Sequence, residues 1–329
     1  MIPVPLIRLA HPGAFVSFLE RIGSPTERIL RNHRLPVYCE DPGAFVPLRN
    51  AWALFDEAAR REDSALGWHV GQFYGDYKLS RGLLKRIEHA PTLYLALQAF
   101  AKLVSAEASH LQLGIHERRD DIVFYTHYPT FKHWPGYLSS QTYQLGIFLD
   151  VIRHYLGPHW VPDEMGTEAP NAPAIAHEAF SGSRVRTGRR LGYLTVPRSC
   201  LHAPPLSRRV LGDAERSLVL ADGFDYVDTV RSLITTYMAD GYPSARVIAR
   251  LMGTSVRTLH RKLSAHGVAY QTLIDGVRFG RAAELLRDRD VGIGDVARSV
   301  GFDDPAHVAR MFRRVGGLSP REFRLTSRA

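Results

Sequence analysis

Residues 245–267 read ARVIARLMGTSVRTLHRKLSAHG, and residues 293–317 repeat the same pattern as IGDVARSVGFDDPAHVARMFRRVGG. In each copy an alanine is followed four residues later by a glycine, and then by two apolar residues spaced four apart. The small residue lets two helices cross closely, the glycine permits a turn at positive φ, and the apolar pair packs the next helix down. Each copy therefore predicts a helix-turn-helix, whose second helix can enter the major groove of DNA.

The two copies are offset by 48 residues, because Ala249 and Gly253 of the first correspond to Ala297 and Gly301 of the second. Apolar residues recur at helical spacing over residues 270–287, which predicts a linker helix roughly 27 Å long between the copies. That length suits two recognition helices about one turn of DNA apart, or about 34 Å. One such pattern arises by chance fairly often, whereas two at this spacing predict a double helix-turn-helix domain.

The second helix of the first copy, expected over residues 256–266, has basic residues on its outer face. Leu259 and Leu263 face inward, so the helical period turns three residues outward: Arg257, His260 and Arg261. Arginine can bond guanine O6 and N7 together, and histidine can bond one base edge or a phosphate, so we assign these three residues to base contacts. Phosphate contacts, which position the protein without specifying sequence, are assigned to Ser255, Thr258 and Lys262.

The second helix of the second copy should begin near Asp304 and expose His307 and Arg310, with Arg313 and Arg314 towards its end. We assign the first pair to bases and the second pair to phosphates. A proline and an alanine occupy the first two helical positions and offer no side-chain donors at the reading end. We therefore expect the first unit to carry more base specificity and the second more backbone affinity.

The composition and charge suit a soluble protein with a polyanionic partner. The 329 residues allow two or three domains. Net charge is +9, and the residues from Asp225 onward carry 17 Lys and Arg against 11 Asp and Glu, although a solvated basic surface is an alternative explanation. Cys39 and Cys200 are too few for a disulfide framework or a zinc site. With neither a signal peptide nor a long apolar run, we expect a cytoplasmic protein that does not cross a membrane.

Five segments of the repeat region resemble the signature of the AraC/XylS transcriptional regulators: residues 255–263 followed by Gly267, 300–305, 310–314, 317–320 and 323–324. The resemblance extends over about residues 226–326 and implies two helix-turn-helix units on adjacent major-groove segments. Five residues match motif positions at which family members contact bases: Arg257, His260, Arg261, His307 and Arg310. The family usually has an aromatic residue in place of Val308 and a serine in place of Ala309, a departure that concerns the contacts of the second unit rather than its fold.

The region before residue 206 reads as a separate domain. Periodicity predicts helices over four segments, at residues 14–22, 48–60, 93–109 and 137–155. Alternation of apolar residues predicts a β-hairpin and one further strand, at residues 111–115, 122–128 and 191–196. The predicted fold class is an α+β N-terminal effector and dimerisation domain at 1–205, a linker at 206–225, and an all-α domain at 226–329 with two helix-turn-helix units joined by a linker helix.

This N-terminal region resembles the effector-binding domain of one AraC/XylS subgroup, that of the ornithine-utilisation regulator and its relatives. The segments that carry the resemblance are residues 62–67, 90–97 and 180–185 with 191–197. The resemblance implies an α+β domain that binds a ligand and mediates dimerisation. The domain type is often labelled arabinose-binding-like, but that label does not establish the sugar as the ligand.

Aromatic residues and histidines of the N-terminal region are candidates for an effector pocket: Trp68, His69, Phe73, Tyr74, His127 and Trp134, with Tyr77 and His133 beside them in sequence. The alternative is that the aromatic residues belong to the core and that the histidines are ordinary core or surface groups. The expectation of a small effector here comes mainly from the domain resemblance.

Enzyme motifs are weak in this sequence. Residues 292–297, GIGDVA, match a G-x-G-x-x-A dinucleotide loop, but no strand precedes them and no βαβ unit surrounds them. The sequence contains no Walker A, H-E-x-x-H or G-x-S-x-G motif, and His127 and His133 lack the spacing of a metal set. We therefore expect no enzyme activity, no cofactor and no metal.

These patterns together predict a bacterial transcription regulator that binds double-stranded operator DNA and responds to an unidentified small molecule. A homodimer is expected, and family analogy favours activation, with RNA polymerase as a further partner. Two alternatives stay open. One is a small-molecule-processing enzyme with a DNA-binding tail. The other is a nonspecific architectural DNA binder, which steep salt dependence without sequence preference would favour.

Overall fold

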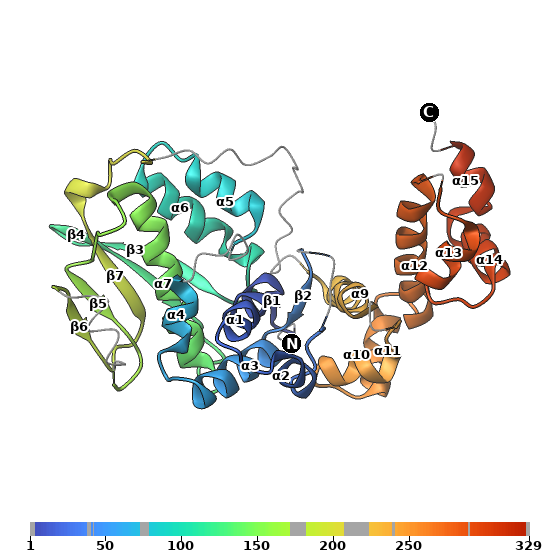
Figure 1. The fold of residues 1–329 in the computed structure, drawn as a ribbon, viewed down its shortest axis with the longest axis horizontal. Coiled ribbons are helices and arrows are strands. Elements are labelled where there is room, and N and C mark those ends of the chain that lie inside the picture. Colours follow the sequence, from blue (N-terminus) through green and yellow to red (C-terminus); the bar gives the residue numbers. More distant parts are fainter. Residues whose placement is uncertain are drawn as a thin grey trace. The chain divides into compact units, whose positions relative to one another are not determined.

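The computed structural model describes most of the chain, which divides into two compact units (Figure 1). The described residues are 4–37, 41, 43–72, 79–171, 182–206, 224–238, 241–288 and 290–326. One unit is built from residues 5–37 and 45–206, and the other from residue 224 onwards with a few residues near 4 and 41–44. The predicted linker at 206–225 lies outside the described residues except at its two ends.

The N-terminal unit contains a five-stranded sheet in the order β3-β4-β7-β5-β6. Its strands are β3 (Gln112–Glu117), β4 (Asp121–His127), β5 (Glu164–Gly166), β6 (Arg184–Arg186) and β7 (Gly192–Pro197). The predicted hairpin is confirmed, because β3 and β4 pair antiparallel with Gln112 opposite His127. The predicted strand at 191–196 is β7, which pairs antiparallel with both β4 and β5, while β5 and β6 run parallel.

Helices pack on one face of this sheet. The ring of Phe124 on β4 lies 4.5 Å from that of Phe148 on α7 (Tyr137–Leu156) and 6.1 Å from that of Phe100 on α6 (Leu93–Leu103), measured between centroids. Side chains alternate along a strand, so Val123 and Tyr125 point to the opposite face. The sheet therefore has one face in the core and one face turned away from these helices.

The other described elements complete this unit. They are β1 (Leu6–Arg8), α1 (Ala10–Arg21), α2 (Thr26–Asn32), β2 (Phe45–Pro47), α3 (Leu48–Arg61), α4 (Leu66–Gln72), α5 (Arg81–Glu88), η1 (Val104–Ala106) and η2 (Arg198–Cys200). Helices α4 and α7 cross so closely that a Cβ added at Gly67 would lie 2.2 Å from the carbonyl oxygen of Ser139. A Cβ at Gly146 would lie 2.8 Å from Cα of Gly71, so this crossing requires glycine on both helices.

The predicted helix at 93–109 is wrong at its end, because α6 stops at Leu103 and a short 3-10 turn follows. The chain then reverses towards β3 through His110, whose φ is +66°. Before that turn, the backbone carbonyl of Glu107 accepts a hydrogen bond from the N–H of Arg8 at 2.7 Å. Apolar spacing continues through both segments, so periodicity could not separate the helix from this pairing with β1.

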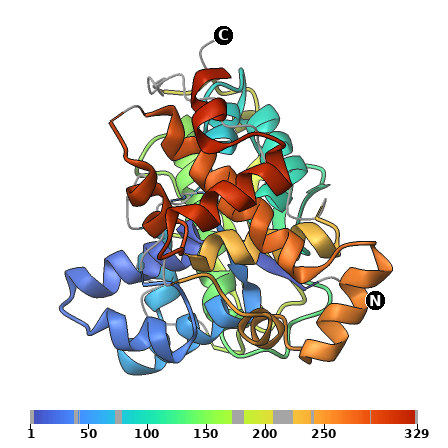
Figure 2. The same cartoon turned by 90° about the vertical axis from the view of Figure 1, so that its right-hand side faces the viewer.

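From residue 224 onwards, the described regular elements of the C-terminal unit are all helices, which carry the orange and red colours in Figure 2. Its helices are α9 (Tyr226–Tyr237), α10 (Ala245–Leu251), α11 (Val256–Ala265), α12 (Tyr270–Arg287), α13 (Ile293–Ser299), α14 (Pro305–Gly316) and α15 (Pro320–Thr326). The linker helix predicted at 270–287 is α12. The α+β and all-α fold classes are both confirmed.

Both helix-turn-helix units of this domain have the turn glycine and the buried alanine that the repeat predicts. Gly253 and Gly301 have φ values of +63° and +74°, in the left-handed region that favours glycine. Ala249 and Ala297 are each 1% exposed, so the small residue of each copy is buried in the core. Ser244 caps α10, because its side chain accepts a hydrogen bond from the N–H of Val247. The same local signals therefore build both units.

Candidate nucleic-acid interface

The recognition helix of the first unit, α11, buries one face and exposes the other. Leu259 and Leu263 are both 0% exposed. The three residues predicted to contact bases are exposed: Arg257, His260 and Arg261. Ser255 caps the helix, because its Oγ accepts a hydrogen bond from the N–H of Thr258 at 3.1 Å. The predicted base-contacting residues therefore share a solvent-facing surface.

The residues of α11 predicted to contact phosphates also have partners within the protein. Ser255 Oγ and Thr258 Oγ1 lie 3.0 Å apart. Lys262 is half-buried, and its Nζ lies 4.8 Å from the ring centroid of Tyr226 on α9. A cation–π contact at a partly exposed site stabilises by about 0.5–1 kcal/mol, so the Lys262 ammonium can exchange this contact for a phosphate at small cost.

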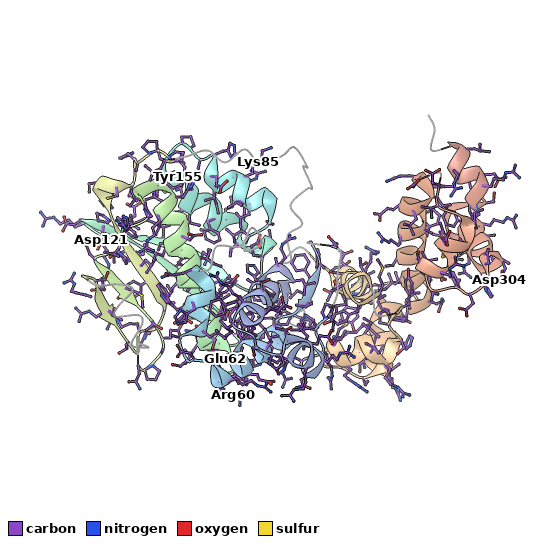
Figure 3. All side chains as sticks on the ribbon, viewed as in Figure 1. Arg60, Glu62, Lys85, Asp121, Tyr155 and Asp304 are labelled. Carbon is purple, nitrogen blue, oxygen red and sulfur yellow. The ribbon has the colours of Figure 1, made fainter. Side chains whose placement is uncertain are left out.

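The recognition helix of the second unit, α14, begins behind a capping aspartate. Asp304 Oδ1 accepts a hydrogen bond from the N–H of Ala306 at 2.8 Å (Figure 3). The helix buries three apolar residues, each 1% exposed or less: Val308, Met311 and Phe312. The four predicted contact residues are exposed: His307, Arg310, Arg313 and Arg314. The His307 ring stacks on Phe302, with centroids 5.7 Å apart and an interplanar angle of 23°.

Arg314 differs from its neighbours because it is bonded to the linker helix. Its Nη2 lies 2.6 Å from Oδ2 of Asp275 on α12, and the Asp275 side chain is only 6% exposed. Gln271 Nε2 donates to the other carboxylate oxygen at 3.1 Å. A buried carboxylate needs such partners to offset its desolvation. Arg314 therefore anchors α14 to α12, and any phosphate contact would have to share the same guanidinium.

The residues predicted to line an effector pocket divide between α4 and the segment after β4. Trp68 on α4 is 3% exposed and belongs to the core. His69 stacks on Phe18 with centroids 6.2 Å apart, and its Nε2 lies 3.5 Å from Asp63 Oδ2. Phe73 and Tyr74, together with Tyr77, lie outside the described residues.

Trp134 packs in an aromatic cluster after β4. Its ring centroid is 4.5 Å from that of Phe131 and 6.1 Å from that of Trp52. His127, at the end of β4, has its pKa lowered by partial burial and by the charge of Lys132. His127 therefore tends to be neutral, and the large ring of Trp134 is half-buried among other rings.

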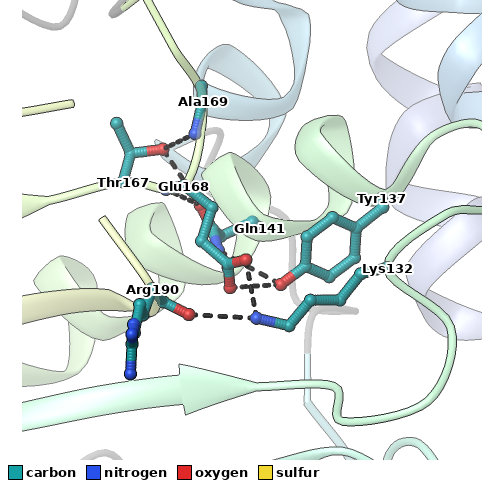
Figure 4. Close-up of polar contacts among 7 residues, drawn as sticks. All are labelled: Lys132, Tyr137, Gln141, Thr167, Glu168, Ala169 and Arg190. Carbon is teal, nitrogen blue, oxygen red and sulfur yellow. Dashed lines mark hydrogen bonds and ion pairs between the residues drawn. The ribbon is translucent and has the colours of Figure 1, made fainter. Parts of the chain in front are cut away.

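Next to these residues, polar side chains form a network in which they hydrogen-bond one another (Figure 4). The Glu168 carboxylate accepts hydrogen bonds from Lys132 Nζ at 2.7 Å, from the Tyr137 hydroxyl at 2.5 Å and from Gln141 Nε2 at 3.1 Å. Burial and the neighbouring Glu168 raise the pKa of Tyr137, so its hydroxyl stays protonated and donates. The network joins α7 to the chain after β5, which is a structural role.

A small cavity of the N-terminal unit is lined mainly by apolar side chains, with His11, Glu107 and Tyr143 among its polar residues. His11 bonds the Tyr143 hydroxyl at 3.0 Å and Glu107 Oε2 at 3.1 Å. Burial alone would raise the pKa of Glu107, but the hydrogen bond and charge of His11, with the charge of Arg8, lower it. The cavity beside this network measures about 30 Å³, room for a water molecule rather than an effector.

A larger, open groove of about 680 Å³ lies on the sheet face opposite the Phe124 side. Side chains of three strands that share this face line it: His116, Val123, Tyr125 and Tyr193. Three arginines also line it: Arg118, Arg189 and Arg190. The Tyr193 hydroxyl donates a hydrogen bond to Glu164 Oε1 at 2.7 Å. None of the predicted effector residues that the structure describes lines this groove.

Comparison with known proteins accounts for both units. Residues 248–326 match a helix-turn-helix domain family, and residues 23–205 match the family described as the arabinose-binding domain of AraC transcription regulators. The chain belongs to the AraC family. It is 27% identical to the HTH-type transcriptional regulator VirS of Mycobacterium tuberculosis over 97% of this chain and 96% of that protein.

Other relatives of this AraC-family chain match smaller parts or match more distantly. It is 35% identical to the HTH-type transcriptional activator RhaS of Escherichia fergusonii, over 34% of this chain and only 41% of RhaS. The crystal structure of the transcriptional regulator CdpR from Pseudomonas aeruginosa aligns with 91% of this chain and 96% of that one, at a TM-score of 0.40 and 20% identity.

Two half-buried residues of this AraC-family DNA-binding domain carry no signal in the sequence. They are Tyr242, which precedes α10, and Arg278 on α12, which contact each other. Arg278 resembles an ordinary surface arginine in sequence, and no motif or periodicity singled it out. In the part of the chain that the structure describes, no group of His, Cys, Asp and Glu could hold a metal ion. Among the same residues, no helix is long and apolar enough to cross a membrane.

Proposed function

We propose that this AraC-family protein is a sequence-specific transcription regulator whose C-terminal domain binds operator DNA and whose N-terminal domain binds a small-molecule effector. The observation that carries the proposal is the matched pair of recognition helices. Each is held by buried apolar residues on one side and exposes arginine and histidine on the other. Such side chains can bond base edges in the major groove.

Each of the two recognition helices makes both base contacts and phosphate contacts with DNA. On α11, base contacts come from Arg257, His260 and Arg261, and phosphate contacts come from Ser255, Thr258 and Lys262. On α14, base contacts come from His307 and Arg310, and phosphate contacts come from Arg313 and Arg314. Pro305 and Ala306 offer no side-chain donors at the start of α14, which supports α11 as the more specific reader.

Selection of binding sites from random duplex DNA tests this proposal, using the purified full-length protein at physiological salt. An enriched motif of two blocks about one helical turn apart is the expected result. Steep salt dependence without any enriched motif would instead support a nonspecific architectural binder. Repeating the selection with residues 226–329 alone separates that outcome from DNA binding that requires the effector.

The effector binds one of two arrangements of the protein more tightly than the other. It thereby shifts the population of the protein towards that arrangement and regulates transcription. The regulator acts as a homodimer and activates transcription through contact with RNA polymerase, in line with the activator name of the relative RhaS. Transcription from a promoter that carries the selected motif, measured with purified RNA polymerase, tests the sign of regulation. Sedimentation of the full-length chain tests the dimer.

The open groove on the sheet is the effector site, and its occupant is a small molecule with an anionic group and an apolar or aromatic body. About 680 Å³ lies within the usual range for ligand pockets, about 300–1,000 Å³. The groove arginines suit a carboxylate, and the tyrosine and aliphatic side chains suit the apolar body. The cavity of about 30 Å³ near His11 is too small to hold such a molecule.

Calorimetry with benzoate and decanoate as probes tests the groove on the full-length protein. Arg189→Ala should weaken binding about tenfold or more, because a hydrogen bond to a charged group contributes about 1.5–3 kcal/mol. Arg28→Ala is the matched control, since this exposed arginine of α2 does not line the groove. Binding of either probe that is insensitive to Arg189→Ala would place the effector elsewhere, with Trp68, His69, His127 and Trp134 the next residues to test.

A further inference from the structure

Arg278 of the linker helix lies between two aromatic rings that belong to different helix-turn-helix units. Its guanidinium carbon is 4.4 Å from the ring centroid of Tyr242 and 4.5 Å from that of Phe302. Tyr242 precedes the first helix of the first unit, whereas Phe302 follows the turn glycine of the second. Among the described residues, the buried Nε of Arg278 has no hydrogen-bond partner, so its contacts with the ring faces dominate.

Tyr242 is also packed directly on the second unit. Its ring lies against the buried cluster formed by α12, α13 and α14. A Cβ at Gly301 would lie 2.7 Å from Cδ2 of Tyr242, so the ring occupies the space that a side chain at this turn would need. The Tyr270 hydroxyl donates to the carbonyl of Pro243 at 2.7 Å, which holds the next residue to the start of α12. The segment that leads into the first helix-turn-helix unit therefore packs, through Tyr242, against the turn of the second unit at Gly301.

Phe302 continues the stack to α14. Its ring lies over His307 with centroids 5.7 Å apart and the planes nearly parallel, at 23°. Four side chains therefore follow one another in contact from the first unit to a predicted base-contacting residue of the second: Tyr242, Arg278, Phe302 and His307.

We propose that Arg278 is a positioning residue that fixes the separation and orientation of α11 and α14, so that both helices fit DNA at one spacing of the two blocks. The inference rests on the proposed function, because it assumes that both helices read DNA. A planar guanidinium offers one face to each ring, whereas a lysine ammonium is a compact point charge that cannot stack in this way. A phosphate contact by Arg278 would instead add affinity at every spacing.

Binding to operators of altered spacing separates these roles. One base pair inserted or removed between the blocks rotates the second block by roughly 35° about the DNA axis. The native protein should prefer the selected spacing by about tenfold or more, and Arg278→Ala should reduce that preference to about threefold or less. Binding to a duplex with only the first block should not change. Arg287→Ala, an exposed arginine on the same helix, is the control and should keep the full preference.

Two further variants make the binding result decisive. Arg278→Lys keeps the charge but should lose the spacing preference as Arg278→Ala does, whereas full rescue by lysine would point to a phosphate contact and overturn the proposal. Tyr242→Ala should have the same effect as Arg278→Ala, and the double variant should add little, because both changes remove one interaction. Equal weakening at all spacings in Arg278→Ala would also overturn the proposal.

A distance measurement tests the same proposal without DNA, so its outcome does not depend on the proposed function. Spin labels are placed at the exposed positions Ser264 on α11 and Val315 on α14, after Cys39 and Cys200 are changed to serine. Pulsed electron resonance should give one narrow distance distribution for the native pair and a clearly broader one for Arg278→Ala. Thermal unfolding confirms that the variant is folded, and an unchanged distribution would overturn the proposal.

Discussion

The two helix-turn-helix units have the same buried skeleton and differ in what surrounds it. Both place a buried alanine before a turn glycine at positive φ, and both bury an apolar pair on the recognition helix. The exposed arginines of α11, Arg257 and Arg261, make no described ion pair, whereas α14 has His307 stacked on Phe302 and Arg314 bonded to Asp275. A repeated pattern therefore specifies the scaffold, while contacts outside the pattern decide what each helix can do on DNA.

This difference suggests that the first unit recognises the DNA sequence, whereas the second unit depends on the linker helix for its position. On α11 the ring of His260 lies 6.2 Å from that of Tyr270, but Arg257 and Arg261 make no described ion pair and can adapt to bases, so the first unit can carry sequence preference. The side chains of α14 are partly held by the linker helix, so the position of the second unit depends on α12.

Removing the core ring of the second unit should separate the two units most clearly. Phe312→Ala deletes a fully buried ring and should lower the free energy of unfolding by about 3–5 kcal/mol. Binding to the second block should be lost, while a duplex with only the first block should bind as before. Leu259→Ala is the matching change in the first unit and should give the opposite pattern. Loss of both blocks in either variant would show that the units fold as one.

Breaking the link between α14 and α12 should have the next largest effect. Arg314→Ala leaves the buried Asp275 carboxylate with Gln271 as its remaining described partner, and we expect about 2–3 kcal/mol of destabilisation. The guanidinium is largely exposed, which places the effect below that of a fully buried pair. Urea unfolding measures it, with Arg313→Ala as a control expected to change stability by less than about 0.5 kcal/mol. Equal stability of the two variants would contradict an anchoring role.

Base reading and phosphate contact should separate within α11. Arg261→Ala should weaken the selected site by about 1–3 kcal/mol and relax specificity at one position. Lys262→Ala should weaken all sequences about equally and reduce the salt slope by about one. Titrations of matched and mismatched duplexes at several salt concentrations measure both effects. An unchanged specificity ratio in Arg261→Ala would mean that the reading face has been assigned wrongly.

The turn glycines should show the smallest difference between the units. Gly253→Ala introduces a side chain at positive φ into open space, so a cost of about 1 kcal/mol is expected. Gly301→Ala has the same backbone cost and also displaces the Tyr242 ring, so about 2 kcal/mol is expected. Thermal unfolding compares the two variants. If Gly253→Ala were the more damaging change, close packing between the units would not be the reason for Gly301.

Much of the DNA-binding domain could be predicted from sequence because its signals are local. The bounds of α12 agree with the expected 270–287, and the buried and exposed positions of α11 follow the period of Leu259 and Leu263. The N-terminal domain was harder to predict. Its hairpin and α7 were expected, but β1, β2 and β6 are each three residues long and carry too few side chains to show a period.

The effector residues show the limit of residue type as a guide. Trp68 and Trp134 were chosen as large aromatic side chains, yet the first is buried in the core and the second packs among other rings. The groove on the sheet is assembled from His116, Tyr125 and Tyr193 on three different strands together with arginines of the adjoining loops. No local pattern marks these residues as neighbours, because the strand order decides which of them meet.

The sequence by itself determined the two helix-turn-helix units, their turn glycines and the outward faces of their recognition helices. Each of these depends on residues within a few positions of one another, where period, capping and backbone preference act directly. Only the tertiary structure decided that Arg314 bonds Asp275, 39 residues away, and that Arg278 lies between Tyr242 and Phe302. These contacts form between helices that must first pack, so their energies depend on the assembled core and leave no mark in the spacing of the chain.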